Sequence, residues 1–501
     1  MTGSFRILPE PALEFNYGQR LVDPHDGLGL FGPYSAPLSY HPKNISYAVI
    51  GAPEGVEAFH RFSEALISPI LPEEADVNPR LWPPFPGFEA AFSARWPLTP
   101  SWTRELDRES LLTAAAHPEA HRRAGDVVKA YLSAVETAKK RDEPLGVIIC
   151  VVPDVVWENC RPRSRVVQPV GGKLSSAERT AARTGQPDFF TDYDPAQYQF
   201  SPDFRRQLKA RVMEHDVPIQ IVRESTMRLH PRLSAEARTL TALSDRAWNL
   251  GVTIYYKAGG KPWKLATARE GVCYIGIAFR MAGSSPGGKT ACCAAQMFLD
   301  SGDGIVFLGE FGPWYSPEDR ECHLSKAAAR DLLTGVLKTY RELDGRRLTE
   351  VFLHSRSTIS AEEFEGYREA CGSEIKMVGV RVRIERSTAK MFRPGAWPVI
   401  RGTFWRLSDR AGYLFGSGFK PSSGTYDGWE TPDPLRIDVE HGEANIDQVA
   451  EDIFGLTKLN YNACKLGDSQ PVTVGFSDAV GEILVSNPTV AARKPNFKFY
   501  I

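Results

Sequence analysis

The chain has 501 residues, of which 42% are hydrophobic and 24% are charged, and its formal net charge is −1. This length is several times that of a typical domain, so we expect two principal domains with separate cores. The composition is that of a folded globular protein, and no apolar run approaches the roughly 18 residues of a membrane span. The near-zero net charge argues against a protein that coats nucleic acid through bulk positive charge.

The N-terminal sequence and the cysteines predict a cytoplasmic protein. MTGSFRILPEPALEF has no basic segment followed by an apolar core, so we predict no secretory signal. The eight cysteines form no CxxC pair, which favours reduced thiols over a disulfide framework or a zinc site.

Positive charge is concentrated in two stretches. Between Lys376 and Arg406 there are eight Lys or Arg and one acid, and between Arg161 and Arg183 there are six bases and one acid. Local basic surfaces on a neutral chain suit a channel for a phosphate backbone. The alternative is a pair of solvated, Arg-rich segments.

The first half alternates strand-like and helix-like patterns. The expected strands are 47–50, 146–152 and 217–222, and the expected helices cover 56–66, 127–135 and 204–214. Repeated strand–helix units predict a parallel, Rossmann-like sheet. Ligands of such sheets bind beyond the carboxyl ends of the strands, so the loops after residues 152 and 222 are the expected binding region.

The second half begins with three strand candidates, 272–280, 290–299 and 304–308, the first two of which are joined by a turn at 283–288. A helix over 325–343, a strand over 350–354 and a helix over 361–371 follow. Three antiparallel strands followed by alternating helices and strands predict a ribonuclease H-like domain.

Four separate segments, in this order, resemble the prokaryotic Argonaute family. They are GLGLFGPY at 27–34, YYKAGG at 255–260, YIGIA at 274–278, and LNYN at 459–462 with QPVT at 470–473. The resemblance implies an α/β protein with a Rossmann-like MID domain followed by a ribonuclease H-like PIWI domain. We expect a lead-in over residues 1–40, a MID-like domain over 41–250 and a PIWI domain over 251–501.

A chain that starts just before MID leaves no room for the N and PAZ domains of long Argonautes, so it resembles the short class. That resemblance implies a sensor that holds a small 5′-phosphorylated guide RNA and pairs it with single-stranded target DNA. It also implies a heterodimer with an APAZ-containing effector of the TIR, sirtuin-like or nuclease type, active in defence against invading DNA. The aromatic and proline residues between Leu81 and Trp102 are candidate partner contacts, and a packed surface loop is the alternative.

A guide-phosphate pocket is expected from four residues. Arg205 and Lys209 are four apart in a predicted helix, which places both side chains on one face. The resemblance adds Gln220 and Lys257 to this pocket, and fixed cations with an amide suit a terminal phosphate. It also implies a magnesium ion held by Gln220 and the C-terminal carboxylate of Ile501.

The nuclease positions of the family are occupied here by Ala278, Ser355 and Phe476. A two-metal nuclease needs several carboxylates around its ions, which these residues cannot supply. We therefore expect no catalytic residues and no enzymatic activity in this chain. The alternatives are a divergent ribonuclease H-like, metal-dependent nuclease and a nucleotide-using Rossmann enzyme, and the absence of GxGxxG argues against the latter.

Overall fold

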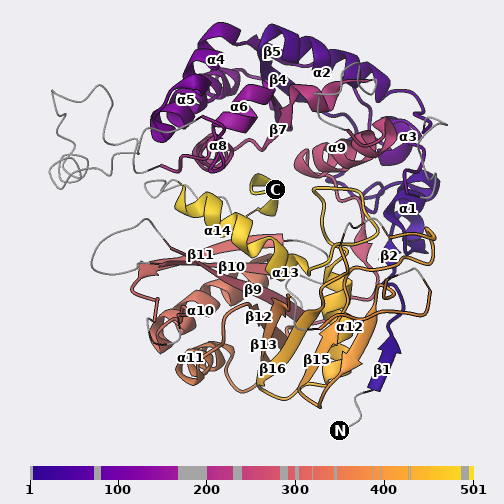
Figure 1. Ribbon diagram of the computed structural model, residues 1–501, viewed down its shortest axis with the longest axis vertical. Coiled ribbons are helices and arrows are strands. Elements are labelled where there is room, and N and C mark those ends of the chain that lie inside the picture. Colours follow the sequence, from indigo (N-terminus) through magenta and orange to yellow (C-terminus); the bar gives the residue numbers. More distant parts are fainter. Residues whose placement is uncertain are drawn as a thin grey trace, which may run out of the picture.

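The computed structural model has two α/β lobes with the C-terminus between them (Figure 1). It describes residues 4–72, 81–166, 200–229, 240–281, 291–298, 304–343 except 317 and 319, 347–386, 389–395, 398–430 except 427 and 429, 431–486 and 496–501. The expected turn at 283–288 and most of the basic stretch 161–183 lie outside the described residues. Within the described part, no helix is both long and apolar enough to cross a membrane.

The first lobe is built on a four-stranded parallel sheet in the order β5-β4-β6-β7. Its strands are β4 (Tyr47–Gly51), β5 (Trp102–Glu105), β6 (Val147–Val152) and β7 (Ile219–Arg223). Alternate residues of the buried strands point to opposite faces, so both faces need a cover. The helices that supply it are α2 (Pro53–Ala65) and α9 (Leu243–Lys257) on one face, and α4 (Arg108–Ala116), α5 (Ala120–Lys139) and α8 (Phe204–Val212) on the other. The predicted parallel sheet is confirmed.

The second lobe is built on a nine-stranded mixed sheet in the order β1-β14-β15-β16-β13-β12-β9-β10-β11. Its strands are β1 (Ser4–Ile7), β9 (Val272–Met281), β10 (Ala291–Phe298), β11 (Gly304–Gly312), β12 (Glu350–Ser355), β13 (Lys376–Ile384), β14 (Thr403–Arg406), β15 (Ala411–Leu414) and β16 (Leu435–His441). β9, β10 and β11 are antiparallel neighbours, and β12 runs parallel to both β9 and β13. This is the ribonuclease H-like order that the sequence predicts.

Helices cover both faces of the second sheet. One face packs on α10 (Lys326–Leu343) and α11 (Ala361–Cys371), and the other on α12 (Ile446–Leu456), α13 (Val472–Gly475) and α14 (Ser477–Val485). At Gly276 an added Cβ would lie 1.8 Å from the main-chain oxygen of Thr473. Only glycine therefore lets α13 approach β9 this closely.

The N-terminal segment is shared between the lobes. β1 is the outermost strand of the second sheet, where it pairs with β14. A three-stranded sheet of β2 (Leu13–Glu14), β3 (Arg20–Leu21) and β8 (Lys264–Leu265) follows, and then helix α1 (Pro24–Phe31). The expected boundary at residue 250 falls inside the continuous helix α9, which belongs to the core of the first lobe.

The aromatic segment over 81–102 is packed into the first lobe. It contains the short helix α3 (Phe88–Phe92). Phe85, Phe88 and Phe92 are fully buried, and Trp96 stacks on Tyr47 with ring centroids 4.5 Å apart. The buried rings cannot serve as partner contacts, whereas Trp82, Pro84 and Pro100 of this segment are partly or fully exposed.

Candidate anion-binding site

Strand β7 is the edge of its sheet, so helices from opposite faces can meet around it. α8 comes from one face and carries Arg205 and Lys209, one helical turn apart. α9 comes from the other face and ends at Lys257. Gln220 lies on β7 between them, so the fold brings all four predicted residues to one edge.

Both lysines of this pocket are buried and hydrogen-bonded. Lys257 Nζ donates to Gln220 Oε1 at 2.6 Å and to the main-chain oxygen of Ile219 at 2.7 Å. Lys209 Nζ donates to the main-chain oxygen of Tyr500 at 3.1 Å. The C-terminal residues therefore form one wall of the pocket.

Burial and neighbouring cations lower the pKa values of all three basic side chains in the pocket, Arg205, Lys209 and Lys257. Burial, followed by repulsion from Arg205 and Lys257, holds the pKa of Lys209 well below its ordinary value. Burial and repulsion from Arg205 do the same to the pKa of Lys257. Burial also lowers the pKa of Arg205, and Arg161 and Arg206 add to that effect. An anion placed among these groups would reverse the repulsion, so the pocket is built for negative charge.

The C-terminal tail, residues 496–501, packs between the lobes. Asn496 bridges to Ile305 of β11, and Ile501 is 3% exposed. The Phe497 ring packs edge-on against Phe298 of β10 and Phe476, with centroid distances of 5.7 and 5.2 Å. Apolar packing on the second lobe thus holds the tail where it reaches Lys209 of the first.

A cavity of about 260 Å³ adjoins the pocket. It is lined by Trp157, residues 220–223, Thr226, Met227, Arg246, Asn249, Leu250, Thr253 and Asn462. The Trp157 ring has the Arg161 guanidinium over it at 4.7 Å and that of Arg223 at 5.7 Å. Residues that follow positions 152 and 222, where the sequence predicts ligand binding, line this cavity. Trp157 and Asn462 were not predicted as lining residues, because neither belongs to a local pattern that points to a ligand.

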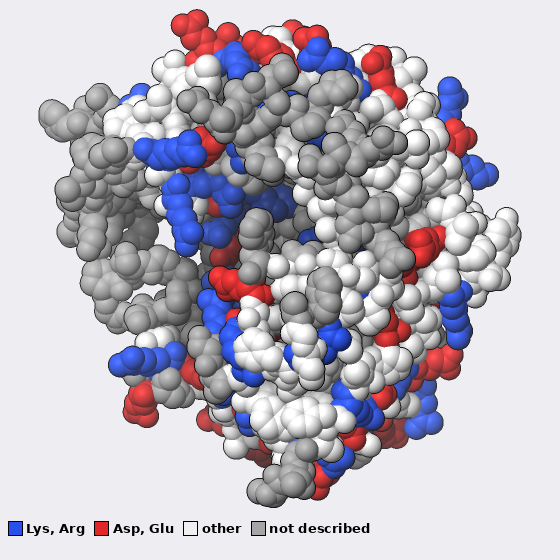
Figure 2. Space-filling view, turned by 45° about the vertical axis from the view of Figure 1, so that its right-hand side comes forward, with Lys and Arg blue, Asp and Glu red and all other residues white. Residues whose placement is uncertain are grey.

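Lys and Arg side chains gather around a hollow between the two lobes (Figure 2). Arg161, Arg205 and Arg206 of the first lobe lie close together, with the carboxylates of Asp203 and Glu482 among them. A chain that carries a net charge of −1 therefore presents a locally basic opening beside the pocket.

Solved structures similar to this chain are Argonaute proteins. Clostridium butyricum Argonaute bound to a guide DNA and a 19-mer target DNA matches with a TM-score of 0.65 and 14% identity, over 100% of this chain and 55% of that one. Aquifex aeolicus Argonaute matches with 0.56 and 11%, over 100% and 57%. Aa-Ago with externally bound siRNA matches with 0.57 and 12%, over 99% and 56%.

These likenesses decide the fold. The chain has the fold of Argonaute MID and PIWI domains. It spans little more than half the length of these Argonaute structures. No protein-family model matches the sequence, and neither does any curated protein. The first lobe is called the MID lobe below, and the second the PIWI lobe.

Ala278, Ser355 and Phe476, which the sequence resemblance places at the nuclease positions of the family, lie in the PIWI lobe. Ala278 is on β9, one residue beyond Ile277, which pairs with Ser355 at the end of β12. Phe476 lies between α13 and α14 and packs on Phe497 of the tail. Among the described residues, no group of three or more His, Cys, Asp or Glu side chains could hold a metal ion.

His354, next to Ser355, is a core residue. It is 1% exposed, and its Nδ1 lies 2.9 Å from Thr473 Oγ1. Burial lowers the pKa of His354 to about 3, so the imidazole is neutral. His354 and Ser355 are successive residues of β12, so their side chains point to opposite faces of the sheet and do not form a nucleophile–base pair.

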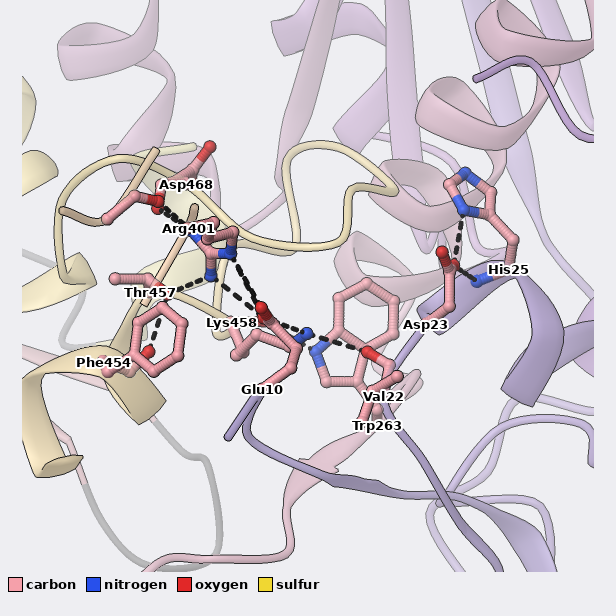
Figure 3. Close-up of polar contacts among 11 residues, drawn as sticks. Glu10, Val22, Asp23, His25, Trp263, Arg401, Phe454, Thr457, Lys458 and Asp468 are labelled. Atoms are coloured by element: carbon pink, nitrogen blue, oxygen red, sulfur yellow. Dashed lines mark hydrogen bonds and ion pairs between the residues drawn. The ribbon is translucent and has the colours of Figure 1, made fainter. Parts of the chain in front are cut away.

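The basic stretch between Lys376 and Arg406 does not form the basic surface that the sequence suggests. Five of its side chains pair with carboxylates from other segments, namely Lys376, Arg381, Lys390, Arg401 and Arg406, and Arg383 pairs with Glu385 of the stretch itself. Arg401 is buried and shares Glu10 with Lys458 (Figure 3). The prediction fails because a count along the chain does not see acids that are distant in sequence.

The predicted magnesium site fits these residues poorly. The Gln220 amide oxygen already accepts a hydrogen bond from the Lys257 ammonium. The charged side chains around it, Arg205, Lys209 and Lys257, are all cations, so the C-terminal carboxylate of Ile501 is the one predicted ligand with the anionic oxygen that magnesium prefers.

Proposed function

We propose that the chain binds the 5′-phosphorylated end of a small guide strand in the pocket of Arg205, Lys209, Gln220 and Lys257. The observation that carries this proposal is the convergence of three cations whose pKa values are lowered by burial and by repulsion from neighbouring cations. A terminal phosphate carries up to two negative charges and accepts several charge-assisted hydrogen bonds. It relieves the repulsion more fully than a single carboxylate could.

The first guide base belongs in the adjoining cavity. The cavity begins at Gln220, which also touches Lys257, so a nucleotide whose phosphate is in the pocket can place its base there. The lining combines the Trp157 ring with the amide side chains of Asn249 and Asn462. Aromatic rings and amides are the groups that stack on bases and bond to their edges.

The rest of the guide is proposed to pair with a complementary target, with RNA as the guide and single-stranded DNA as the target. Ala278, Ser355 and Phe476 support a role in recognition without cutting, because they offer no carboxylates for a two-metal mechanism. Recognition without cutting has an effect only through a second activity, which we assign to another polypeptide. We propose an APAZ-containing effector in that role, within a defence against invading DNA.

The test is guide binding as a function of the 5′ group. Dissociation constants are measured for one RNA with a 5′ phosphate and the same RNA with a 5′ hydroxyl. The parent protein should prefer the phosphate by about tenfold or more, since several charge-assisted contacts depend on it. Replacing both Lys209 and Lys257 with Met should abolish that preference.

The matched control is Lys326→Met on α10, where the lysine is exposed and pairs with Glu365 and Glu369. It removes a positive charge from the PIWI lobe without touching the pocket and should leave the preference intact. If the parent protein bound both RNAs equally, the proposed function would be wrong.

A further inference from the structure

Helix α14 lies between the lobes, where it contacts both α8 and β9 (Figure 1). Its residue Glu482 binds an arginine from each lobe. Glu482 Oε2 is 2.5 Å from Arg206 Nη2 on α8, and Oε1 is 2.9 Å from Arg280 Nη2 on β9. One carboxylate therefore holds two guanidinium groups that come from different lobes.

This trio connects two regions that a bound nucleic acid would touch. Arg206 is the neighbour of Arg205 in the phosphate pocket, and Arg280 is two residues beyond Ala278 on the strand of the former nuclease centre. The charge of Glu482 also acts on Arg205, whose pKa it raises against the larger effect of burial.

Positive charge exceeds negative charge around the trio. Asp203 is the other nearby carboxylate, 3.6 Å from Arg206 Nε and 3.8 Å from Arg161 Nε. Asp203 is 2% exposed and caps α8 by accepting from the main-chain nitrogens of Arg205 and Arg206, so it is fixed in place. The side chain of Glu482 is 26% exposed and does not cap α8, so it can move away from Arg206 and Arg280 into solvent.

A carboxylate between two guanidinium groups has the charge and the oxygen spacing that a phosphodiester would offer. Arginine binds both anions through paired N–H groups, and binds phosphate strongly. The side chains of Arg206 and Arg280 are about one-third exposed, so a strand in the hollow can reach them. Ion pairs with this much exposure are weak, which makes the exchange feasible.

We propose that Arg206 and Arg280 form a second phosphate site, for a backbone phosphodiester of the bound guide, which Glu482 occupies in the guide-free protein. This inference rests on the proposed function, because it takes the 5′ end of the guide to be in the adjacent pocket. The phosphodiester replaces the carboxylate, and Glu482 turns to solvent. Glu482 is thus a competitor of the guide built into the chain.

The first test is Glu482→Gln, which keeps the size of the side chain and removes its charge. Guide affinity should rise by about fivefold, which is the strength of an exposed ion pair expressed as a binding ratio. Equal or weaker binding by this variant would overturn the proposal.

The matched control is Glu365→Gln on α11, which also removes a carboxylate from an exposed ion pair, here with Lys326. Its affinity should equal that of the parent. A gain as large as that of Glu482→Gln would mean that any lost negative charge strengthens binding, and would contradict a specific site.

The second test locates the phosphodiester. Guides are prepared with one neutral methylphosphonate linkage at a time, and the parent is compared with Glu482→Gln. The variant should lose its higher affinity for guides modified at one linkage, or at two adjacent linkages, and should keep it for guides modified anywhere else. Adding Arg280→Gln should remove the advantage for every guide, whereas an advantage that is uniform along the guide and survives Arg280→Gln would refute the site.

Failure of this inference is distinguishable from failure of the proposed function. A parent protein that ignores the 5′ phosphate shows that the pocket is wrong. A parent that depends on the 5′ phosphate, combined with a Glu482→Gln variant that gains nothing, shows that the pocket is right and the second site is wrong.

Discussion

The buried ammonium groups of Lys209 and Lys257 are the residues that a guide phosphate would change most. Without a guide, burial and nearby cations hold both pKa values well below the ordinary value. A bound phosphate favours the charged form of each lysine and therefore raises both pKa values. At pH values between the lysine pKa of the empty pocket and the higher lysine pKa of the guide complex, the complex binds more protons than the free protein and the free guide together.

Guide binding is therefore expected to take up protons, and affinity should fall as pH rises through that interval. The phosphate itself titrates near pH 6 and is fully ionised above pH 7.5, so it does not obscure the effect. Calorimetry at pH 8 in two buffers with different ionisation enthalpies measures the uptake. The Lys209→Met, Lys257→Met double variant should show none, and Lys326→Met should behave as the parent. A parent complex that forms without proton uptake would argue against cation relief as the source of phosphate binding.

The sequence predicted residues of this pocket directly only where their spacing lies within one helix. The four-residue spacing of Arg205 and Lys209 reveals a shared helix face, and the resemblance supplied Gln220 and Lys257. Glu482 escaped prediction because its partners are 276 and 202 positions away in the chain. A carboxylate in a short helix has no sequence pattern that marks it as a bridge between lobes.

At the scale of elements, the N-terminal strap over residues 4–26 ties the two lobes together. Glu10 accepts hydrogen bonds from Arg401 Nε at 3.0 Å and Lys458 Nζ at 2.9 Å, and Lys458 Nζ also donates to the main-chain oxygen of Val22 at 2.8 Å (Figure 3). The side chains of Arg401 and Lys458 are 1% and 0% exposed. Burial lowers the pKa of Lys458 to about 8 even with Glu10 beside it.

Replacing Glu10 with Gln should destabilise the protein strongly, because it leaves two buried cations without their shared anion. Removing one partner of a buried pair costs about 3–5 kcal/mol. The control is Glu451→Gln, which breaks the exposed pair of the same strap with Arg6 and should cost about 1 kcal/mol or less. Thermal denaturation should show a much larger drop in apparent Tm for Glu10→Gln. Equal drops would mean that the strap is held by β1 pairing instead.

Strands and helices were predictable where their hydrophobic periodicity is strong, as in β4, β6, β9 and α10. The place of β1 in the sheet was not, because its neighbour β14 lies some 400 residues further along the chain and all four of its residues are exposed. Such a strand is specified by backbone pairing with a distant edge, which leaves no alternating pattern in the sequence.

At the scale of the whole molecule, the C-terminal tail links the proposed guide pocket to Phe476 of the PIWI lobe. Its residue Phe497 packs on Phe476, at the position where the family has a metal ligand, and Tyr500 bonds to Lys209 in the pocket. The ring at 476 therefore has a packing role that a metal ligand at this position could not fulfil.

We expect the loaded protein to bind its target without cutting it, in magnesium or manganese. The triple variant Ala278→Asp, Ser355→Asp, Phe476→Asp should also fail to cut. Its first two carboxylates would replace buried side chains, where desolvation and mutual repulsion favour the neutral acid. Its third would remove a ring contact of Phe497 and loosen the tail, so this variant should also bind the phosphorylated guide more weakly than the parent. A labelled target incubated with loaded protein measures cleavage, and guide titration measures the loss. Guide-dependent cutting by the parent at one fixed internal position would show that its ligands lie elsewhere.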